Sequence, residues 1–358
     1  MSVLKKGEEA MMFSVTERAM KPKVQRSSQS FRSRKDQKKY WALLTICFIL
    51  GLFASVGLLV YQNPVPVTSP SFIPVVRRRA VALVAMLIAA VAQSISTVAF
   101  QSTTNNRIIT PSLLGFEALY STINTATIFF FGSGVFLRFN EGLVSFLFQI
   151  GVMIIMSLML YGWLLSGKYG NLQLMLLVGV VIGTGLKSVS SFMRKLLAPS
   201  EFDILQARLF GSVSNADESY FPIAIPLVVV ASILLFMNAK RLNVLALGKA
   251  TSTSLGVNHQ RGVIYTLILV SLLMSVSTAL LGPLTFYGFL VATMTYQLVP
   301  TFDHRYIFPM SVVLRFLVIT GSYFFMYHVF RAQGVVSIII ELFGGIIFLV
   351  VLLRKGTL

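Results

Sequence analysis

The residues of this sequence that could handle a substrate are polar side chains placed beside or inside long apolar segments. The densest group opens the stretch "FQSTTNNRIITPSLLGFEALY", residues 100–120, where amides and hydroxyls directly follow an apolar segment. Pro111 and Gly115 then interrupt the backbone where the next apolar segment begins. Irregular backbone at membrane depth is tolerated only where it is buried in protein or lines a wet cavity. The run is either an ordinary loop or a polar lining near the inner gate of a translocation path. We favour the lining, with the candidate residues Gln101, Asn105, Asn106, Pro111 and Gly115.

Ionisable side chains inside the apolar segments form a second group of candidates: Glu117, Lys187, Arg315 and Glu341. Such groups are costly in a bilayer and call for a functional or pairing hypothesis. Arg315 and Glu341 lie in consecutive apolar segments, so they could form an ion pair that fixes helix packing or that belongs to a pathway. Glu117, near one end of its segment, could reach interfacial water. These scattered groups give only weak support to the relay that an ion-coupled carrier needs.

Three adjacent cations, Arg77, Arg78 and Arg79, precede the apolar segment that leads into the polar run. Long cationic side chains can extend to lipid headgroups, which would make the cluster a simple membrane anchor. The same charges could form a rim that receives an acidic protein partner. Both interpretations remain open on physical grounds.

Nucleotide and metal chemistry are not supported by the motifs. A P-loop needs Ser or Thr after its Gly-Lys pair and a glycine five residues before it, and Gly248-Lys249 is followed by Ala250. Cys47 is the one cysteine, which excludes an intrachain disulfide and a cysteine metal cluster. The histidines are scattered along the chain at His259, His304 and His328. We therefore expect a protein that is not itself an enzyme and that holds no metal or other cofactor.

The elements that must position these residues are membrane-spanning helices. The chain of 358 residues is 56% hydrophobic and only 12% charged, whereas soluble domains average about 25% charged residues. Apolar runs of about 20 residues can cross a bilayer, which indicates an all-α polytopic membrane protein. About ten spans are expected, since helices of this length recur along the chain: 41–61, 80–100, 113–133, 142–165, 172–190, 220–239, 262–282, 284–299, 309–330 and 338–353.

Positive charge sets the expected orientation. The net charge of +18 fits loops on the cytoplasmic side of a bilayer better than nucleic-acid binding, since Lys and Arg accumulate there. Most of these cations fall in the tail and in loops on the tail's side, so both termini are expected in the cytoplasm. For residues 1–40 we expect a basic, mostly disordered cytoplasmic tail, and for 41–355 a membrane domain with the ten spans. An outer amphipathic loop is expected at 191–219 and a cytoplasmic loop at 240–261.

The cytoplasmic loop, "RLNVLALGKATSTSLGVNHQRG", is more patterned than a simple turn requires. Leu242, Leu245 and Leu255 give short helices an apolar face. Gly248 and Gly256 permit a sharp turn or the close approach of another backbone. A plain solvated loop would not need both glycines, so the loop is interpreted as a docking element.

Four motifs in order resemble the FecCD-type permeases, the membrane subunits of ABC importers for iron-siderophores, haem and cobalamin. The first is the 100–120 stretch, similar to that family's Gln…Asn-Pro-Leu-Ala…Pro-x-Leu-Leu-Gly signature. The others are "LNVLALGKATSTSLGVN", "GPLTFYGFLV" and "VVSIIIELFGGIIFLVVLLRK". The resemblance covers about 77–355. It departs from the pattern at Arg107, Lys249, Ala292-Thr293, Tyr296, Tyr323 and Tyr327.

The resemblance implies a permease subunit of an ATP-driven importer in a bacterial plasma membrane. The "TTNNRIITPS" form resembles a branch in which two different permeases pair and the cargo is a catechol-type ferric siderophore. Alternatives are a haem or cobalamin permease or, less favoured, an ion-coupled secondary transporter. Further implied partners are cytoplasmic ATPase subunits and an extracytoplasmic siderophore-binding protein, which would dock on Arg77, Arg78 and Arg79. The implied ATPase-coupling residues are Leu242, Leu245, Leu247, Gly248, Ser252, Leu255 and Gly256.

Overall fold

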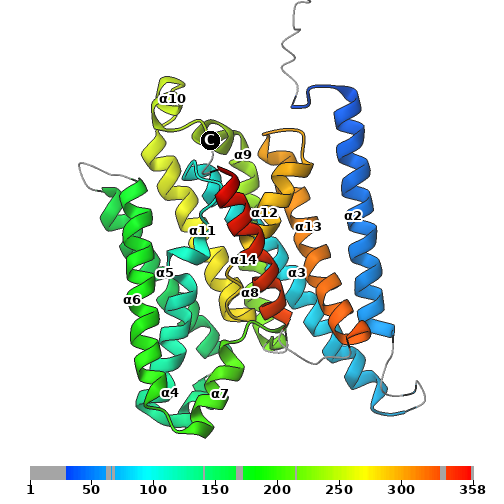
Figure 1. Ribbon diagram of the computed structural model, residues 1–358, viewed down its shortest axis with the longest axis vertical. Helices are drawn as coiled ribbons and strands as arrows, with labels where there is room; N and C mark the ends of the chain where they lie inside the picture. The colour runs from blue at the N-terminus through cyan, green and yellow to red at the C-terminus, as the bar shows by residue number, and fades with distance from the viewer. Residues whose placement is uncertain are drawn as a thin grey trace, which may run out of the picture.

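The computed structural model describes residues 30–61, 66, 69–139, 142–166, 172–213, 216–330 and 336–355. Within these ranges every regular element is a helix (Figure 1). Six helical stretches are long and apolar enough to cross a membrane: Arg34–Val60, Phe72–Thr103, Leu174–Lys195, Glu218–Met237, His259–Leu281 and His304–Val329. The expectation of an all-helical, multi-pass membrane protein is confirmed. The count of ten spans and their orientation stay predictions.

The helices follow one another with short connections. The first part of the described chain holds α2 (Arg34–Val60), α3 (Phe72–Thr103), η1 (Pro111–Leu114), α4 (Phe116–Phe139), α5 (Leu143–Ser166), α6 (Leu172–Lys195) and α7 (Pro199–Leu209). The second part holds η3 (Glu218–Tyr220), α8 (Phe221–Met237), α9 (Ala239–Leu245), α10 (Lys249–Ser254), α11 (His259–Leu281), α12 (Tyr287–Leu298), α13 (His304–Phe324), η4 (Phe325–Val329) and α14 (Val336–Lys355).

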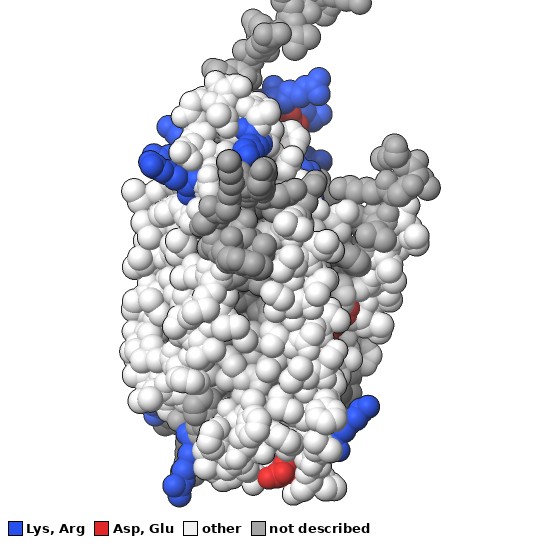
Figure 2. Space-filling model, turned by 90° about the vertical axis from the view of Figure 1, so that its left-hand side faces the viewer, with Lys and Arg blue, Asp and Glu red and all other residues white. Residues whose placement is uncertain are grey.

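The bundle has two distinct ends. Helices α9 and α10 lie at one end, where α2 begins and α14 ends, and α7 lies at the other (Figure 1). We call these the α9/α10 end and the α7 end. Lys and Arg side chains gather at both ends, and the band between them on the face that Figure 2 shows is almost free of charged side chains. This distribution is typical of a protein that sits in a bilayer.

Helices α3 and α11 form the centre of the bundle. Of their most apolar windows, 67% and 78% is buried, against 22% for α2 at the edge. The central helices also bury many hydroxyl side chains, such as Ser96 on α3 and Ser271 on α11. Small hydroxyl residues let helices approach closely and return hydrogen bonds to their own backbone, which suits packing within a membrane.

Two elements of the bundle are shorter or more ordered than expected. Helix α12 has 12 residues, which span about 18 Å at 1.5 Å per residue and so cover only part of a bilayer. The expected disordered tail is corrected in part. Residues 1–29 lie outside the described residues, but Phe31 is buried and packs on Tyr40 and Tyr306. Apolar burial of this kind orders the segment that leads into α2.

Candidate functional site

The α9–α10 segment, expected to be a docking element, divides its side chains between the core and solvent. Leu242 and Leu245 are buried in the core, and Ser252 is buried as well. Leu247 and Leu255 are 56% and 59% exposed. The first three residues therefore hold the segment on the bundle. The two exposed leucines form the apolar part of its free surface.

Two glycines shape that surface, and one of them lies beside the polar run. Gly248 has φ 89° and Gly256 has φ 78°, in the left-handed region that favours glycine. A Cβ at Gly256 would meet nothing within 4 Å, and one at Gly248 would lie 3.7 Å from Asn105 Nδ2. The end of the polar run is therefore in van der Waals reach of the α9–α10 turn. The structure brings these two predicted groups together.

Two of the predicted lining residues form hydrogen bonds within the turn after α3. Gln101 Nε2 donates a hydrogen bond to the Arg107 carbonyl at 2.8 Å. Asn106 Oδ1 accepts from the Ile108 amide at 2.9 Å. Because these side chains satisfy backbone groups of an irregular segment, they stabilise its shape. Their part in a polar lining near the inner gate of a translocation path stays a prediction.

Pro111 and Gly115 fix the approach of α6. Pro111 starts the short helix η1, and Gly115 follows it at φ 102°. A Cβ at Gly115 would lie 3.3 Å from the Cα of Gly183 on α6, and the reciprocal distance is 3.1 Å. The two backbones touch, so neither position has room for a side chain. This contact places α6 against the start of α4.

A cavity of about 350 Å³ opens between α4, α6, α7, the α11–α12 connection and α14. Its charged lining is Glu117, Lys187, Arg194 and Glu341. An adjoining, more open hollow of about 380 Å³ runs along α6 and shares Lys187 and Ser191 with the first. Acidic and basic groups therefore face one polar space beside a helix that is apolar enough to span a membrane.

Glu117 closes the break in the backbone between α11 and α12. Its Oε1 accepts from the Leu284 amide at 3.1 Å, and its Oε2 accepts from the Thr285 hydroxyl. Glu341 Oε1 accepts from the Thr285 amide at 3.4 Å. Glu117 is only 4% exposed, which corrects the expectation that it reaches interfacial water. Carboxylates at the start of a helix stabilise unpaired amides and the positive end of its dipole.

Arg315 and Glu341 do not form the ion pair considered above. The Arg315 guanidinium lies over the Tyr287 ring, with Cζ 4.0 Å from its centroid. Its Nη2 donates to Gln93 Oε1. The hypothesis failed because Glu341 is held by the α11–α12 break and not by α13. A buried arginine held by a ring face and an amide is a packing element of α3, α12 and α13.

A polar stripe on α6 was missed by the sequence reasoning, apart from Lys187, which was singled out as an ionisable group. Thr184, Lys187, Ser188 and Ser191 are exposed and line the two hollows. Their spacing of three, four and seven residues puts them on one face of a helix. That periodicity, inside an otherwise apolar window, was the signal that would have identified them.

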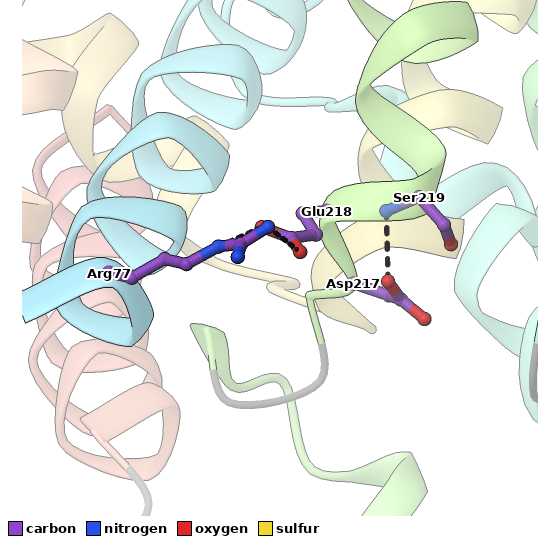
Figure 3. A network of polar contacts seen from close by, with 4 residues as sticks. All are labelled: Arg77, Asp217, Glu218 and Ser219. Atoms are coloured by element: carbon purple, nitrogen blue, oxygen red, sulfur yellow. Dashed lines mark hydrogen bonds and ion pairs between the residues drawn. The ribbon is translucent and has the colours of Figure 1, made fainter. Parts of the chain in front are cut away.

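The three arginines expected to receive a partner differ in the contacts that their side chains make. Arg77 pairs with Glu218 at 2.6 Å, with the two side chains 70% and 48% exposed (Figure 3). Arg79 Nη1 donates to carbonyl groups at the end of α2, including that of Leu58 at 3.1 Å. Arg78 is exposed and makes no side-chain hydrogen bond or ion pair to the described part of the chain. Among the contacts of the described residues, Arg78 is therefore the unpaired cation of the cluster.

Comparison with known proteins identifies one family along almost the whole chain. The model of the FecCD transport family matches residues 39–354. The petrobactin import system permease protein FatC of Bacillus anthracis is 68% identical over 93% of this chain and 94% of its own length. The corresponding permease YclO of Bacillus subtilis is 34% identical over 88% of this chain and 95% of its own. A metal-chelate type ABC transporter solved in an inward-facing conformation has the same fold, with a TM-score of 0.72 at 19% identity over 87% of this chain and 99% of its own. The chain belongs to the FecCD transport family.

Proposed function

We propose that this chain is a permease subunit of an ATP-driven importer that brings ferric siderophores of the catecholate class across a bacterial plasma membrane. The main support is its 68% identity to a petrobactin import permease over nearly its full length. Petrobactin is a catecholate siderophore. Haem or cobalamin import is the alternative within the same family. An ion-coupled carrier has no support from these relatives, which are import-system permeases.

The proposed path runs along the polar stripe of α6. Lys187 is exposed although it lies within an apolar helix. A lysine at this depth is too costly to face lipid and should face water or protein. A second permease opposite α6 and α14 would enclose the two hollows as a wet path. In that path the Lys187 ammonium would attract the anionic oxygens of a ferric siderophore.

The second permease is proposed to be a different chain. The petrobactin import system permease protein FatD of Bacillus anthracis is 26% identical to this chain over 76% of it. FatC and FatD are thus two distinct permeases named for one import system in one organism. We propose an equivalent heterodimer, ATPase subunits on the α9–α10 surface, and a binding protein at Arg78. This places the α9/α10 end and both termini in the cytoplasm, with about ten spans between the two ends, as the basic loops favour.

Uptake of radioactive iron as ferric catecholate or haem, and of radioactive cobalt as cobalamin, in a strain that lacks this chain tests the proposal. Complementation should restore uptake of ferric catecholates but not of haem or cobalamin. Lys187→Met should lower uptake about tenfold, the effect of losing one charge-assisted contact. Lys187→Arg keeps the cation and should retain most of the activity. Restoration of haem or cobalamin uptake alone would favour the alternative, and equal uptake by Lys187→Met and wild type would exclude the proposed path.

A further inference from the structure

A series of hydrogen bonds between side chains connects the polar end of α3 to α9 and to the start of α13. The Ser102 hydroxyl lies 2.6 Å from His304 Nε2. The other ring nitrogen, Nδ1, contacts Asn243 Oδ1 at 2.5 Å. Asn243 Nδ2 donates to Asp303 Oδ1 at 3.0 Å. Three helices that are far apart in sequence therefore meet through four side chains.

In each hydrogen bond of this series, the donor lies on the Ser102 side and the acceptor lies on the Asp303 side. Asn243 uses its amide nitrogen on Asp303, so its oxygen must accept, and it accepts from both His304 Nδ1 and the His304 backbone amide at 3.0 Å. His304 Nδ1 is then the protonated nitrogen, and Nε2 is free to accept from Ser102. The carboxylate of Asp303 terminates the series. Aligned hydrogen bonds in a buried setting strengthen one another, and His304 is only 2% exposed.

The N-terminal segment also binds the Asp303 carboxylate, through its second oxygen. Ser30 Oγ donates to Asp303 Oδ2 at 2.8 Å, and the Arg305 amide donates to Oδ1 at 3.1 Å. Burial alone would raise the pKa of Asp303, but the hydrogen bonds from Asn243, Arg305 and Ser30 lower it below its ordinary value. Asp303 is therefore ionised at neutral pH.

Apolar packing holds α9 in place even without this series of hydrogen bonds. Leu242 and Leu245 flank Asn243 and are buried in the core. Asn243 adds a directional contact to the side of α9 that lies near α3 and α13. Ser102, at the other end of the series, belongs to the same polar run as Asn105, which lies beside Gly248. The polar run is thus connected to the α9–α10 segment at two points.

We infer that Ser102, His304 and Asn243 are positioning residues that transmit movement of the α9–α10 segment to the end of α3. This inference rests on the proposed contact of that segment with ATPase subunits. A push on α9 would move Asn243, and the short contacts to His304 and Ser102 would pass the displacement to the polar run. A hydrogen-bonded series can do this because each contact has a narrow range of length and angle.

The test uses the complete complex in proteoliposomes, with uptake per ATP hydrolysed as the readout. Asn243→Leu breaks the series at α9. His304→Asn keeps a donor near the Nδ1 position, and His304→Gln keeps a polar group near the Nε2 position, so each preserves one half. Ser94→Ala is a matched control for Ser102→Ala, because Ser94 also joins α3 to α13 through a buried hydrogen bond, 3.0 Å to the Ser311 carbonyl. That contact does not reach α9.

We expect Asn243→Leu and both His304 variants to lower uptake per ATP about tenfold, within the usual range of coupling between two sites. Ser102→Ala should lower it by several-fold, and Ser94→Ala by less than twofold. The ATPase subunits should still co-purify with every variant. Equal effects of Ser94→Ala and Ser102→Ala would show that only general packing of α3 on α13 matters, which would overturn the inference.

Hydrogen exchange separates failure of the inference from failure of the proposed function. In the isolated permease, Asn243→Leu should speed amide exchange at 100–106 about tenfold, since the far end of the series loses its support. This measurement needs neither cargo nor ATP. Unchanged exchange at 100–106 would refute the connection even if transport proceeds as proposed. Absence of ferric siderophore uptake by the wild-type complex would instead refute the proposed function and leave the exchange result to decide the connection.

Discussion

Replacement of Glu117 tests whether its carboxylate closes the break between α11 and α12. In Glu117→Ala the Leu284 amide and the Thr285 hydroxyl both lose their acceptor. A buried donor left without a partner costs about 1–3 kcal/mol, which applies to the buried Leu284 amide. The half-buried Thr285 hydroxyl lines the cavity and adds less. Glu341→Ala is the matched control. Glu341 is partly exposed, and its one contact to this break is long, at 3.4 Å to the Thr285 amide; its removal should cost no more than about 1 kcal/mol.

Thermal unfolding of the detergent-solubilised protein measures the difference. For a chain of this size a shift of about 2 °C per kcal/mol is expected, so loss of the Leu284 acceptor in Glu117→Ala should lower the unfolding midpoint by about 2–6 °C, with a smaller addition from Thr285. Glu341→Ala should lower it by about 2 °C or less. Glu117→Gln keeps one acceptor oxygen and should fall between them. All scans need one heating rate, because membrane proteins often unfold irreversibly. Equal midpoints for Glu117→Ala and Glu341→Ala would refute the assignment of Glu117 as the group that satisfies the break.

Other predictions address the two ends of the bundle. Gly248→Trp should abolish co-purification of the ATPase subunits. Gly248→Ala carries the same backbone strain of about 1–3 kcal/mol at φ 89° and ψ 170° without the bulk, and should retain much of it; equal binding by both would argue against a docking surface there. Arg78→Glu should weaken binding-protein affinity at low salt by several-fold and reduce its salt dependence, while Arg79→Glu should mainly lower thermal stability; an unchanged affinity for Arg78→Glu would remove the rim from the site. Phe31→Ala should cost roughly 3 kcal/mol in unfolding measurements, whereas deletion of residues 1–29 should change the midpoint less; the reverse order would contradict the packing of Phe31 on Tyr40 and Tyr306.

Local features of the site were predictable where the chain itself creates the constraint. Gly248 and Gly256 were identified because glycine permits a sharp turn or the close approach of another backbone, and both adopt a positive φ. The polar run was identified because amides and hydroxyls are rare beside an apolar helix. Gly115 was identified because it interrupts the backbone with Pro111 before the next apolar segment, and it is required by a backbone contact with Gly183. These signals are short in sequence, so no knowledge of helix packing was needed to find them.

Pairings between distant segments were not predictable in the same way. Arg315 and Glu341, which were considered as partners, lie in consecutive helices. The Arg315 side chain contacts Tyr287 and Gln93 instead, and the Glu341 side chain contacts Thr285. The interior of an apolar helix offers several faces, and helix rotation decides which neighbour a charge meets. Composition alone does not fix that rotation.

The sequence by itself determined the class of this protein, its family motifs and the position of the α9–α10 segment. Apolar length and the distribution of charge dictate membrane helices because a bilayer imposes a simple solvation cost on each residue. Only the tertiary structure decided that Glu117 satisfies a broken backbone and that Lys187 faces a cavity. It also joined Ser102, His304 and Asn243 in one series. Such contacts depend on how helices are rotated and stacked, and hydrogen bonds of this kind form only when the packing brings donors and acceptors within about 3 Å.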